Sequence, residues 1–254
     1  MSKALLYDAT LCVGCKQCEA GCAQQNGLPY DDKVAAELVQ SDHKFTVVLN
    51  KNEKYMRKMC MHCEDPACAS VCPVGALRKT SAGPVIYEED RCMGCRYCMV
   101  ACPFGVPKYE WSKVLPKVQK CVMCPDRLAA GQQTACAESC PTGATKFGER
   151  EELIKEAQDR LRANPGNYVP HVFGVEEVGG TSVLLLSGMA FEEFGFNPKD
   201  MPKDPLPLYT YRVLSRIPDF VPLGGMVLGG IWWITHRRED VAEAEANEHK
   251  GGAK

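Results

Sequence analysis

The longest uninterrupted hydrophobic pattern lies near the C-terminal end of the chain. Residues 220–235 contain no charged side chain, and a histidine and two arginines follow them directly. A bilayer-spanning helix needs about 20 apolar residues, with a lower limit near 17, so the run reaches this length only if it begins at Ile217. We predict a transmembrane helix over residues 217–236 and a charged tail with little fixed structure over residues 237–254. A buried or re-entrant segment is the alternative, because Gly and Pro are common in both settings.

Shorter patterns predict the elements of the remaining chain. Apolar residues at helical spacing indicate a short helix at 34–39, and residues 45–49 with a turn at 50–52 indicate a hairpin. A Gly-Pro turn that leads into Val-Ile-Tyr at 85–87 indicates a second hairpin. Residues 149–162 have apolar positions four apart, acids early, arginines late and an Asn-Pro-Gly stop after them. They are expected to form the clearest helix of the soluble part.

Cysteine changes this picture, because the chain has 16 cysteines and all of them lie between residues 12 and 140. They fall into four groups of four that repeat one short unit. The first and third groups have the spacing C-x2-C-x2-C-x3-C, and the second and fourth lengthen the middle gap to four and eleven residues. In chain order the groups are Cys12, Cys15, Cys18 and Cys22; Cys60, Cys63, Cys68 and Cys72; Cys92, Cys95, Cys98 and Cys102; and Cys121, Cys124, Cys136 and Cys140.

Charge and missing motifs exclude several function classes. The chain has 30 basic and 32 acidic residues and a net charge of -2, so no large basic field attracts nucleic acid. Neither the G-x-G-x-x-G fingerprint nor the G-x-x-x-x-G-K-[ST] loop occurs, so any redox cofactor must be held by the cysteines. The first residues lack the apolar run and cleavage site of a leader, and we expect no secretion signal on this chain itself.

The cysteine spacing suits an iron-sulfur cube. A C-x2-C-x2-C loop can wrap three corners of a 4Fe-4S cluster, and in two-cluster ferredoxins the fourth cysteine ligates the other cluster. A proline follows the fourth cysteine in the second, third and fourth groups, as in the bacterial C-x2-C-x2-C-x3-C-P run, whereas Ala23 stands there in the first. With four thiolates for each cube, the 16 cysteines predict four 4Fe-4S clusters.

Tetrahedral zinc, disulfides and free buried thiols are the alternatives. Zinc ribbons use two separated C-x2-C hooks and do not require a third cysteine two residues on. Within C-x2-C-x2-C-x3-C the thiols are too crowded for a set of unstrained disulfides. Iron and sulfide are therefore favoured, and the hypothesis of another class is a zinc-binding, non-redox scaffold that only bridges partners.

Because paired motifs exchange their fourth ligands, the groups must be assigned to pairs, and sequence order permits two pairings. The second and third groups are separated by residues 73–91, which contain a turn and a hairpin, so we pair them and leave the first group with the fourth. The expected ligand sets are Cys12, Cys15 and Cys18 with Cys140; Cys121, Cys124 and Cys136 with Cys22; Cys60, Cys63 and Cys68 with Cys102; and Cys92, Cys95 and Cys98 with Cys72.

Several polar residues lie beside these ligands in the sequence. His62, inside a cluster loop, is interpreted as tuning the cluster potential by a hydrogen bond or by charge, with plain packing as the alternative. Arg78, Lys79, Arg96 and Lys120 are candidates for raising cluster potentials or attracting an acidic partner, although ordinary solvated cations are an equal alternative.

The motifs resemble those of a known family. They read Leu-Cys-Val-Gly-Cys at 11–15, Cys-Met-His-Cys-Glu-Asp-Pro-Ala-Cys at 60–68, Cys-Met-Gly-Cys-Arg-Tyr-Cys at 92–98 and Cys-Pro-Thr-Gly-Ala at 140–144. Over about residues 4–190 the chain resembles the four-cluster iron-sulfur subunits of membrane-bound respiratory oxidoreductases, such as quinone-linked nickel-iron hydrogenase, formate dehydrogenase and menaquinone reductase complexes. The resemblance implies that all 16 cysteines are cluster ligands and that the chain makes no bonds itself.

The implied fold is α+β, with two pseudo-symmetric ferredoxin-like lobes that each hold two 4Fe-4S clusters, and one C-terminal transmembrane helix. Residues 1–148 are expected to be the four-cluster domain, with an insertion at 23–59. Residues 149–210 are expected to be a helix followed by an extended segment that contacts partners.

The implied function is electron transfer inside a hetero-oligomer. One partner is an extracytoplasmic redox subunit of the molybdopterin, nickel-iron or multihaem cytochrome type, and the other is a polytopic membrane subunit that binds quinone. His236, Arg237 and Arg238 favour a cytoplasmic tail by the positive-inside rule, although Arg212 and Arg216 weaken this. The expectation is a single-pass protein of the inner membrane, with its cluster domain on the periplasmic side after export with a signal-bearing partner. A soluble polyferredoxin-like carrier is the alternative.

Overall fold

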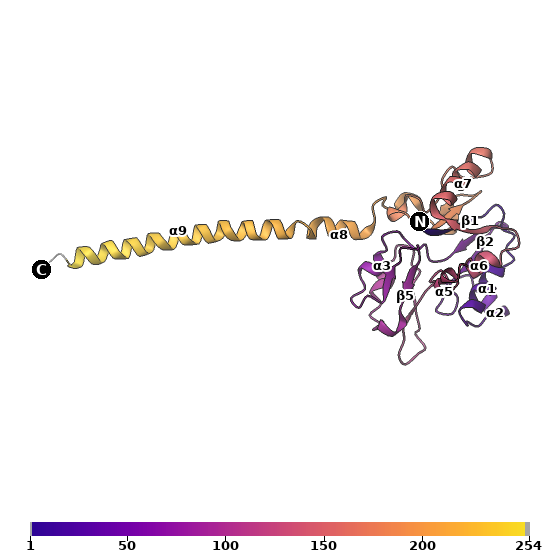
Figure 1. The fold of residues 1–254 in the computed structure, drawn as a ribbon, viewed down its shortest axis with the longest axis horizontal. Coiled ribbons are helices and arrows are strands. Elements are labelled where there is room, and N and C mark those ends of the chain that lie inside the picture. The colour runs from indigo at the N-terminus through magenta and orange to yellow at the C-terminus, as the bar shows by residue number, and fades with distance from the viewer. Residues whose placement is uncertain (1, 252–254) are drawn as a thin grey trace. The chain divides into compact units, whose positions relative to one another are not determined.

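The computed structural model describes residues 2–251, and the chain forms two units, Met1–Pro207 and Leu208–Lys254. In Figure 1 the first unit mixes short strands and short helices, and the described part of the second is helical. The cysteines all lie in the first unit.

A three-stranded sheet joins distant parts of the first unit. Its central strand is β1 (Lys3–Asp8), which pairs antiparallel with β8 (Thr145–Glu149) and parallel with β9 (Val183–Leu186). Leu5 stands opposite Phe147 on one side and Val183 on the other. The sheet therefore binds the N-terminus to the segments that follow the last cysteine.

The two faces of this sheet serve different cores. Ala4 and Leu6 of β1 pack with Leu184 of β9 beneath helix α7 (Arg150–Ala163), which contributes Leu153. Because side chains alternate along a strand, the neighbouring positions face the other way. There Leu5, Tyr7, Val183 and Leu185 pack in a larger core that includes Cys18, Cys22, Cys60, Cys121 and Cys136. One face of the sheet thus forms a wall of the cysteine-containing interior.

Short elements carry and connect the cysteine loops. The hairpins are β2 (Val47–Lys51) with β3 (Lys54–Lys58), β4 (Leu77–Lys79) with β5 (Val85–Tyr87), and β6 (Lys108–Tyr109) with β7 (Val118–Gln119). The α-helices of this region are α1 (Gln17–Gln25), α2 (Asp32–Ala36), α3 (Ala67–Ser70), α4 (Tyr97–Ala101), α5 (Pro125–Ala129) and α6 (Ala135–Glu138). Single 3-10 turns are η1 (Glu89–Arg91), η2 (Glu177–Gly179), η3 (Phe191–Phe194) and η4 (Pro198–Asp200).

The segment between the first two cysteine groups is fixed by a buried ion pair. Lys44 Nζ lies 2.9 Å from Glu19 Oε2, and both side chains are almost fully buried. The other carboxylate oxygen of Glu19 accepts the Val48 N–H at 2.6 Å. Glu19 belongs to α1, so this carboxylate attaches strand β2 to the helix that carries Cys18 and Cys22.

Several predicted elements are confirmed with shifted ends. The hairpin of β4 and β5 and the helix α7 lie where the sequence predicts them. The helix predicted at 34–39 is α2, which begins at Asp32 because the Asp31 side chain caps it by accepting the Val34 N–H at 2.9 Å. The first hairpin turns at Asn52 and Glu53, both with positive φ, and not at 50–52. Strands β1 and β9 are not among the elements predicted from the sequence.

The second unit contains most of a long helical stretch. Helix α8 (Leu206–Leu214) begins at the unit boundary, and α9 (Ile217–Gly251) continues the chain. By length and composition this stretch can cross a membrane, with a mean hydropathy of 1.3 in its apolar window and none of that window buried. Phe220, Leu228 and Trp232 each expose 64–69% of their surface. Such a face requires lipid or a protein partner to cover it.

The expectation of a tail with little fixed structure is wrong for the described residues. Helix α9 continues without interruption beyond residue 236 to Gly251. Ala242, Ala244 and Ala246 alternate there with glutamates, and both residue types are strong helix formers. A helix already nucleated by the apolar run therefore extends into the charged segment.

We predict that Leu184→Ala destabilises the first unit. Leu184 is fully buried in the core beneath α7, and a Leu-to-Ala cavity costs about 2–5 kcal/mol, or roughly 5–15 °C in thermal midpoint. Leu115→Ala is the control, because Leu115 is 82% exposed. The measurement is thermal unfolding of the two variants in parallel, and equal midpoints would contradict the packing described for β9.

Candidate iron-sulfur sites

The four cysteine groups share one backbone feature. The residue two positions after the first cysteine has a left-handed conformation in every group, with φ of 70° at Gly14, 49° at His62, 73° at Gly94 and 61° at Met123. Alternating right- and left-handed residues turn successive N–H groups to one side and form anion-binding concavities that recur at iron-sulfur sites. The loops therefore have the backbone shape that a negatively charged cluster requires.

Cys22 lies with the fourth loop, as the exchanged pairing predicts. One cavity is lined by Cys121, Cys124 and Cys136 together with Cys22, and Arg57 and Thr134 complete part of its wall. Burial raises the pKa of the Cys22 thiol well above its usual value, and the thiols of Cys121, Cys136 and Cys124 raise it further. Packing of α1 against α6 brings these two regions of sequence together.

Cys72 lies with the third loop. A second cavity is lined by Cys92, Cys95 and Cys98 together with Cys72, and Leu77, Tyr87 and Val118 are among its apolar walls. Burial raises the pKa of Cys98 to about 11, and the thiols of Cys92, Cys95 and Cys72 contribute to the rise. Helices α3 and α4 pack together at this point.

Cys102 lies with the second loop. The pKa of Cys63 is raised, first by burial and then by the neighbouring thiols of Cys60, Cys102 and Cys68. Burial also raises the pKa of Cys68 to about 12, again with contributions from Cys60 and Cys102. These four sulfurs are the ligand set that the exchanged pairing predicts for the second cysteine group.

The structure brings the four cysteines expected around the first loop together less completely than the other three sets. Cys12 and Cys18 are neighbours beside Tyr7, and Cys15 is exposed. The fourth expected sulfur, of Cys140, accepts the Thr145 N–H at 3.4 Å and lies 3.8 Å from the Thr142 hydroxyl. Its place two residues after α6, which packs on α1, brings Cys140 to the region of the first loop. No hydrogen bond among the described residues joins its sulfur to the other three.

No disulfide joins any of the 16 cysteines. In the part of the chain that the structure describes, no three His, Cys, Asp or Glu side chains converge on one point as ligands of a single ion would. Thiolates that hold a cube stand at its corners and surround a volume instead. Each of the two cavities has four cysteine thiols in its lining as ligands, which fits a 4Fe-4S cluster.

Two buried cations support the same fit. Arg57 is 2% exposed, and its donors reach the hydroxyls of Thr46 at 2.8 Å and Thr145 at 3.1 Å. Among the described residues no carboxylate forms an ion pair with it, and although burial opposes its charge, the thiols of Cys136, Cys18 and Cys121 raise its pKa. A buried cation without a counter-ion is strongly unfavourable, and negative charge on these sulfurs, or on a cluster that they bind, would compensate it.

Lys120 is the second of these cations, and it is 3% exposed. Its Nζ donates to the carbonyls of Val85 at 2.6 Å and Cys121 at 2.9 Å. Its charge lowers the pKa of the nearby Cys68, against the larger effect of burial. Lys120 was a sequence candidate for raising cluster potentials. Arg57 was missed, although only Lys58 and Met59 separate it from Cys60 in the sequence.

The other cations named from the sequence have partners at the surface. Arg78 pairs with Glu88 at 2.7 Å and Lys79 with Glu64 at 3.1 Å. The guanidinium of Arg96 lies 5.3 Å from the ring centres of Tyr109 and Trp111. The contacts of Arg78 and Arg96 are those of ordinary surface cations, whereas the Lys79 side chain is 19% exposed and also donates to the His62 carbonyl at 3.1 Å.

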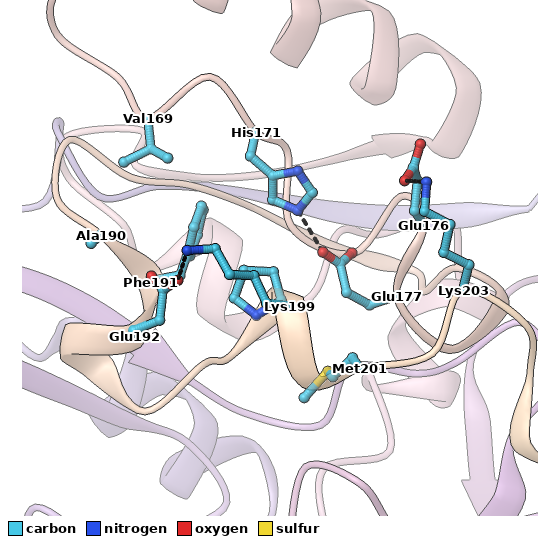
Figure 2. Close-up of a pocket in the computed structure, with 11 residues that line it drawn as sticks. Val169, His171, Glu176, Glu177, Ala190, Phe191, Glu192, Lys199, Met201 and Lys203 are labelled. Atoms are coloured by element: carbon cyan, nitrogen blue, oxygen red, sulfur yellow. Dashed lines mark hydrogen bonds and ion pairs between the residues drawn. The ribbon is translucent and has the colours of Figure 1, made fainter.

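A groove of about 590 Å³ lies elsewhere in the first unit, between the segment after α7 and the turns η3 and η4 (Figure 2). His171 Nε2 lies 2.5 Å from Glu177 Oε1, and the other oxygen of Glu177 accepts the Gly174 N–H at 2.6 Å. Lys203 pairs with Glu176 at 2.7 Å. The residues that line the groove include no cysteine, so it is separate from the cluster chemistry, and His171 has a structural partner.

Comparisons with known proteins agree with this geometry. Residues 51–150 match a family described as a 4Fe-4S dicluster domain, a range that includes the second, third and fourth cysteine groups. The hydrogenase-2 operon protein HybA of Escherichia coli O157:H7 is 38% identical over 80% of this chain and 73% of its own length. The formate dehydrogenase iron-sulfur subunit of Haemophilus influenzae is 33% identical over 90% of this chain and 78% of its own length.

The chain belongs to the iron-sulfur electron-transfer subunits of respiratory oxidoreductases. A further relative is a subunit of the anaerobic dimethyl sulfoxide reductase of Escherichia coli strain K12, which is 40% identical over 62% of this chain and 78% of its own length. For an iron-sulfur subunit, free buried thiols and buried cations without carboxylate partners have a common explanation. Both kinds of group become stable when clusters are bound.

We predict that Arg57→Met makes the nearby clusters harder to reduce. A unit charge a few ångströms away contributes about 1–4 kcal/mol, so the midpoint potentials are expected to fall by on the order of 50 mV or more. Arg57→Lys keeps the charge and is the matched control, with a smaller shift. The measurement is a redox titration followed by electron paramagnetic resonance (EPR), and unchanged potentials in Arg57→Met at full iron content would contradict the electrostatic role.

Proposed function

We propose that this subunit relays electrons through four 4Fe-4S clusters, between an extracytoplasmic redox partner and a quinone-binding integral membrane subunit of a respiratory complex. The observation that carries the proposal is the composition of the two cavities. Each is lined by three cysteines of one loop and the fourth cysteine of a different loop, which is the exchange expected of paired ferredoxin-type motifs.

In this proposal every cysteine is a ligand, in two lobes of two clusters each. Cluster I is bound by Cys12, Cys15, Cys18 and Cys140; cluster IV by Cys121, Cys124, Cys136 and Cys22; cluster II by Cys60, Cys63, Cys68 and Cys102; and cluster III by Cys92, Cys95, Cys98 and Cys72. When bound, the clusters would carry electrons one at a time. The polypeptide supplies the ligands, the buried cations and the exclusion of water.

Neighbouring thiols suggest the order of the four sites. Besides burial, Cys136 raises the pKa of Cys18, Cys60 raises that of Cys121, and Cys98 raises that of Cys68. These electrostatic interactions support a row in the order I, IV, II, III. Cys15 of the first set and Cys95 of the third are exposed, so both ends of the row approach the surface, where partner proteins could exchange electrons.

The proposed partners follow from the relatives. A formate dehydrogenase iron-sulfur subunit and a subunit of dimethyl sulfoxide reductase are both parts of hetero-oligomers. We propose for this chain a catalytic or multihaem subunit of the molybdopterin, nickel-iron or cytochrome type, and a polytopic subunit that binds quinone such as menaquinone. Membership of this family disfavours a zinc scaffold, and the exposed apolar face of α9 disfavours a soluble polyferredoxin-like carrier.

Residues 217–236 are proposed to cross the inner membrane once. The cluster domain would then lie on the periplasmic side and reach it by export with a signal-bearing partner. The support is the exposed apolar helix and the cluster of His236, Arg237 and Arg238 that follows it. The same charges would leave the end of α9 in the cytoplasm.

The proposed function predicts co-purification from detergent-solubilised membranes with a large redox subunit and a polytopic membrane protein, and reduction of a quinone analogue by that complex. A variant lacking residues 217–254 is expected to keep its clusters but to be released by salt without detergent. The test is protein identification together with quinone reduction. Release of the full chain by salt alone would contradict the membrane assignment.

The ligand exchange predicts which substitutions share a phenotype. Cys22→Ser is expected to alter or remove the same EPR signal as Cys136→Ser, because both residues are proposed ligands of cluster IV. Cys18→Ser, only four residues before Cys22, is expected to affect a different signal and is the matched control. If Cys22→Ser and Cys18→Ser instead affected one common signal, the exchanged pairing would be wrong.

A further inference from the structure

His62 occupies a position that distinguishes its loop from the other three. The corresponding left-handed residues are Gly14, Gly94 and Met123, which have no hydrogen-bond donor in their side chains. His62 is fully buried, with 0% of its surface exposed. A polar ring therefore stands in the second loop where the other loops have a hydrogen atom or an apolar side chain.

Main-chain contacts fix this loop in place. The carbonyl of His62 accepts the Ser182 N–H at 3.1 Å and the Lys79 ammonium at 3.1 Å. On the next residue but one, the Glu64 N–H donates to the Gly180 carbonyl at 2.9 Å. The segment before β9 and the end of β4 thus fix the backbone of this loop and the direction in which the His62 ring points.

The imidazole tautomer follows from its partner on β5. The Val85 N–H donates to His62 Nδ1 at 2.9 Å, and a nitrogen that accepts a hydrogen bond carries no proton. An imidazole whose Nδ1 carries no proton is neutral and has a single N–H. The ring proton is therefore on Nε2.

This Nε2–H has no acceptor in the polypeptide. Among the described residues no oxygen, nitrogen or sulfur atom accepts from it, and the buried ring cannot reach bulk water. Buried donors are almost always satisfied in folded proteins. Sulfide and thiolate sulfurs are the acceptors that a bound cluster would add to this loop, and hydrogen bonds to them help to set the cluster potential.

Resting on the proposed function, we propose that His62 donates an Nε2–H hydrogen bond to a sulfur of the cluster bound by Cys60, Cys63, Cys68 and Cys102. His62 is thus a positioning residue. With His62 in the loop, this cluster is easier to reduce than it would be with glycine or methionine at the same position. No proton is transferred. The Nε2–H hydrogen bond would become stronger with more negative charge on the sulfur and would therefore favour the reduced state.

The chain itself offers the matched substitution. His62→Met copies the residue of the fourth loop and removes the donor, whereas His62→Gln places an amide N–H near the former Nε2. In EPR-monitored redox titrations of the whole complex, we expect His62→Met to shift one of the four midpoint potentials to a more negative value. His62→Gln is expected to retain most of the original potential. Iron content is measured first, so that only fully loaded preparations are compared.

A second readout needs no substitution in the cluster loop. With 15N-labelled histidine, pulsed EPR of the wild-type complex is expected to detect a nitrogen coupled to one reduced cluster. His43→Leu should retain this coupling, because the ring of His43 is partly exposed and bonds to Asp42. Absence of the coupling in the wild type, or four unchanged potentials in loaded His62→Met, would overturn the hydrogen bond and leave the relay intact. A wild-type complex without iron-sulfur signals would instead contradict the proposed function.

Discussion

The negative charge of buried thiolates and of the clusters they would bind must be balanced by nearby cations and backbone N–H groups. Most of the first unit is arranged around that requirement. A cluster with four thiolates is an anion in a low-dielectric interior, where an uncompensated charge is strongly unfavourable. Left-handed residues at Gly14, His62, Gly94 and Met123 turn the main chain to form concave loops. Arg57 and Lys120 then place positive charge between loops that are far apart in the sequence.

The helices and strands beside the cysteine loops are short, and tertiary packing holds them in place. Helices α3, α4 and α6 have only four or five residues, and isolated helices of that length are unstable in water. Packing in pairs, α1 with α6 and α3 with α4, holds them beside the cysteines. The three-stranded sheet connects the two cores, because β1 contributes side chains both to the core with the cysteines and to the core beneath α7.

The cysteine chemistry was readable from the sequence because ligand spacing is local. The repeated C-x2-C hooks predict each loop, and the exchange of fourth ligands predicts that Cys22 and Cys72 join other loops, where the structure places them. The pairing of strands β1 and β9 was not predictable in the same way, since it joins Leu5 with Val183, which are far apart in the sequence. Arg57 was missed for a similar reason: its role depends on Cys18 and Cys136, which only the fold brings near it.

The most direct test of the account is the metal content of the subunit in its purified complex. Four cubes require about sixteen iron atoms and about sixteen acid-labile sulfides for each copy of this chain, after subtraction of metal in its partners. The account predicts that stoichiometry, with zinc far below one atom per chain. About four zinc atoms without sulfide, or iron sufficient for only two clusters, would contradict the central claim that all four cysteine groups hold redox clusters.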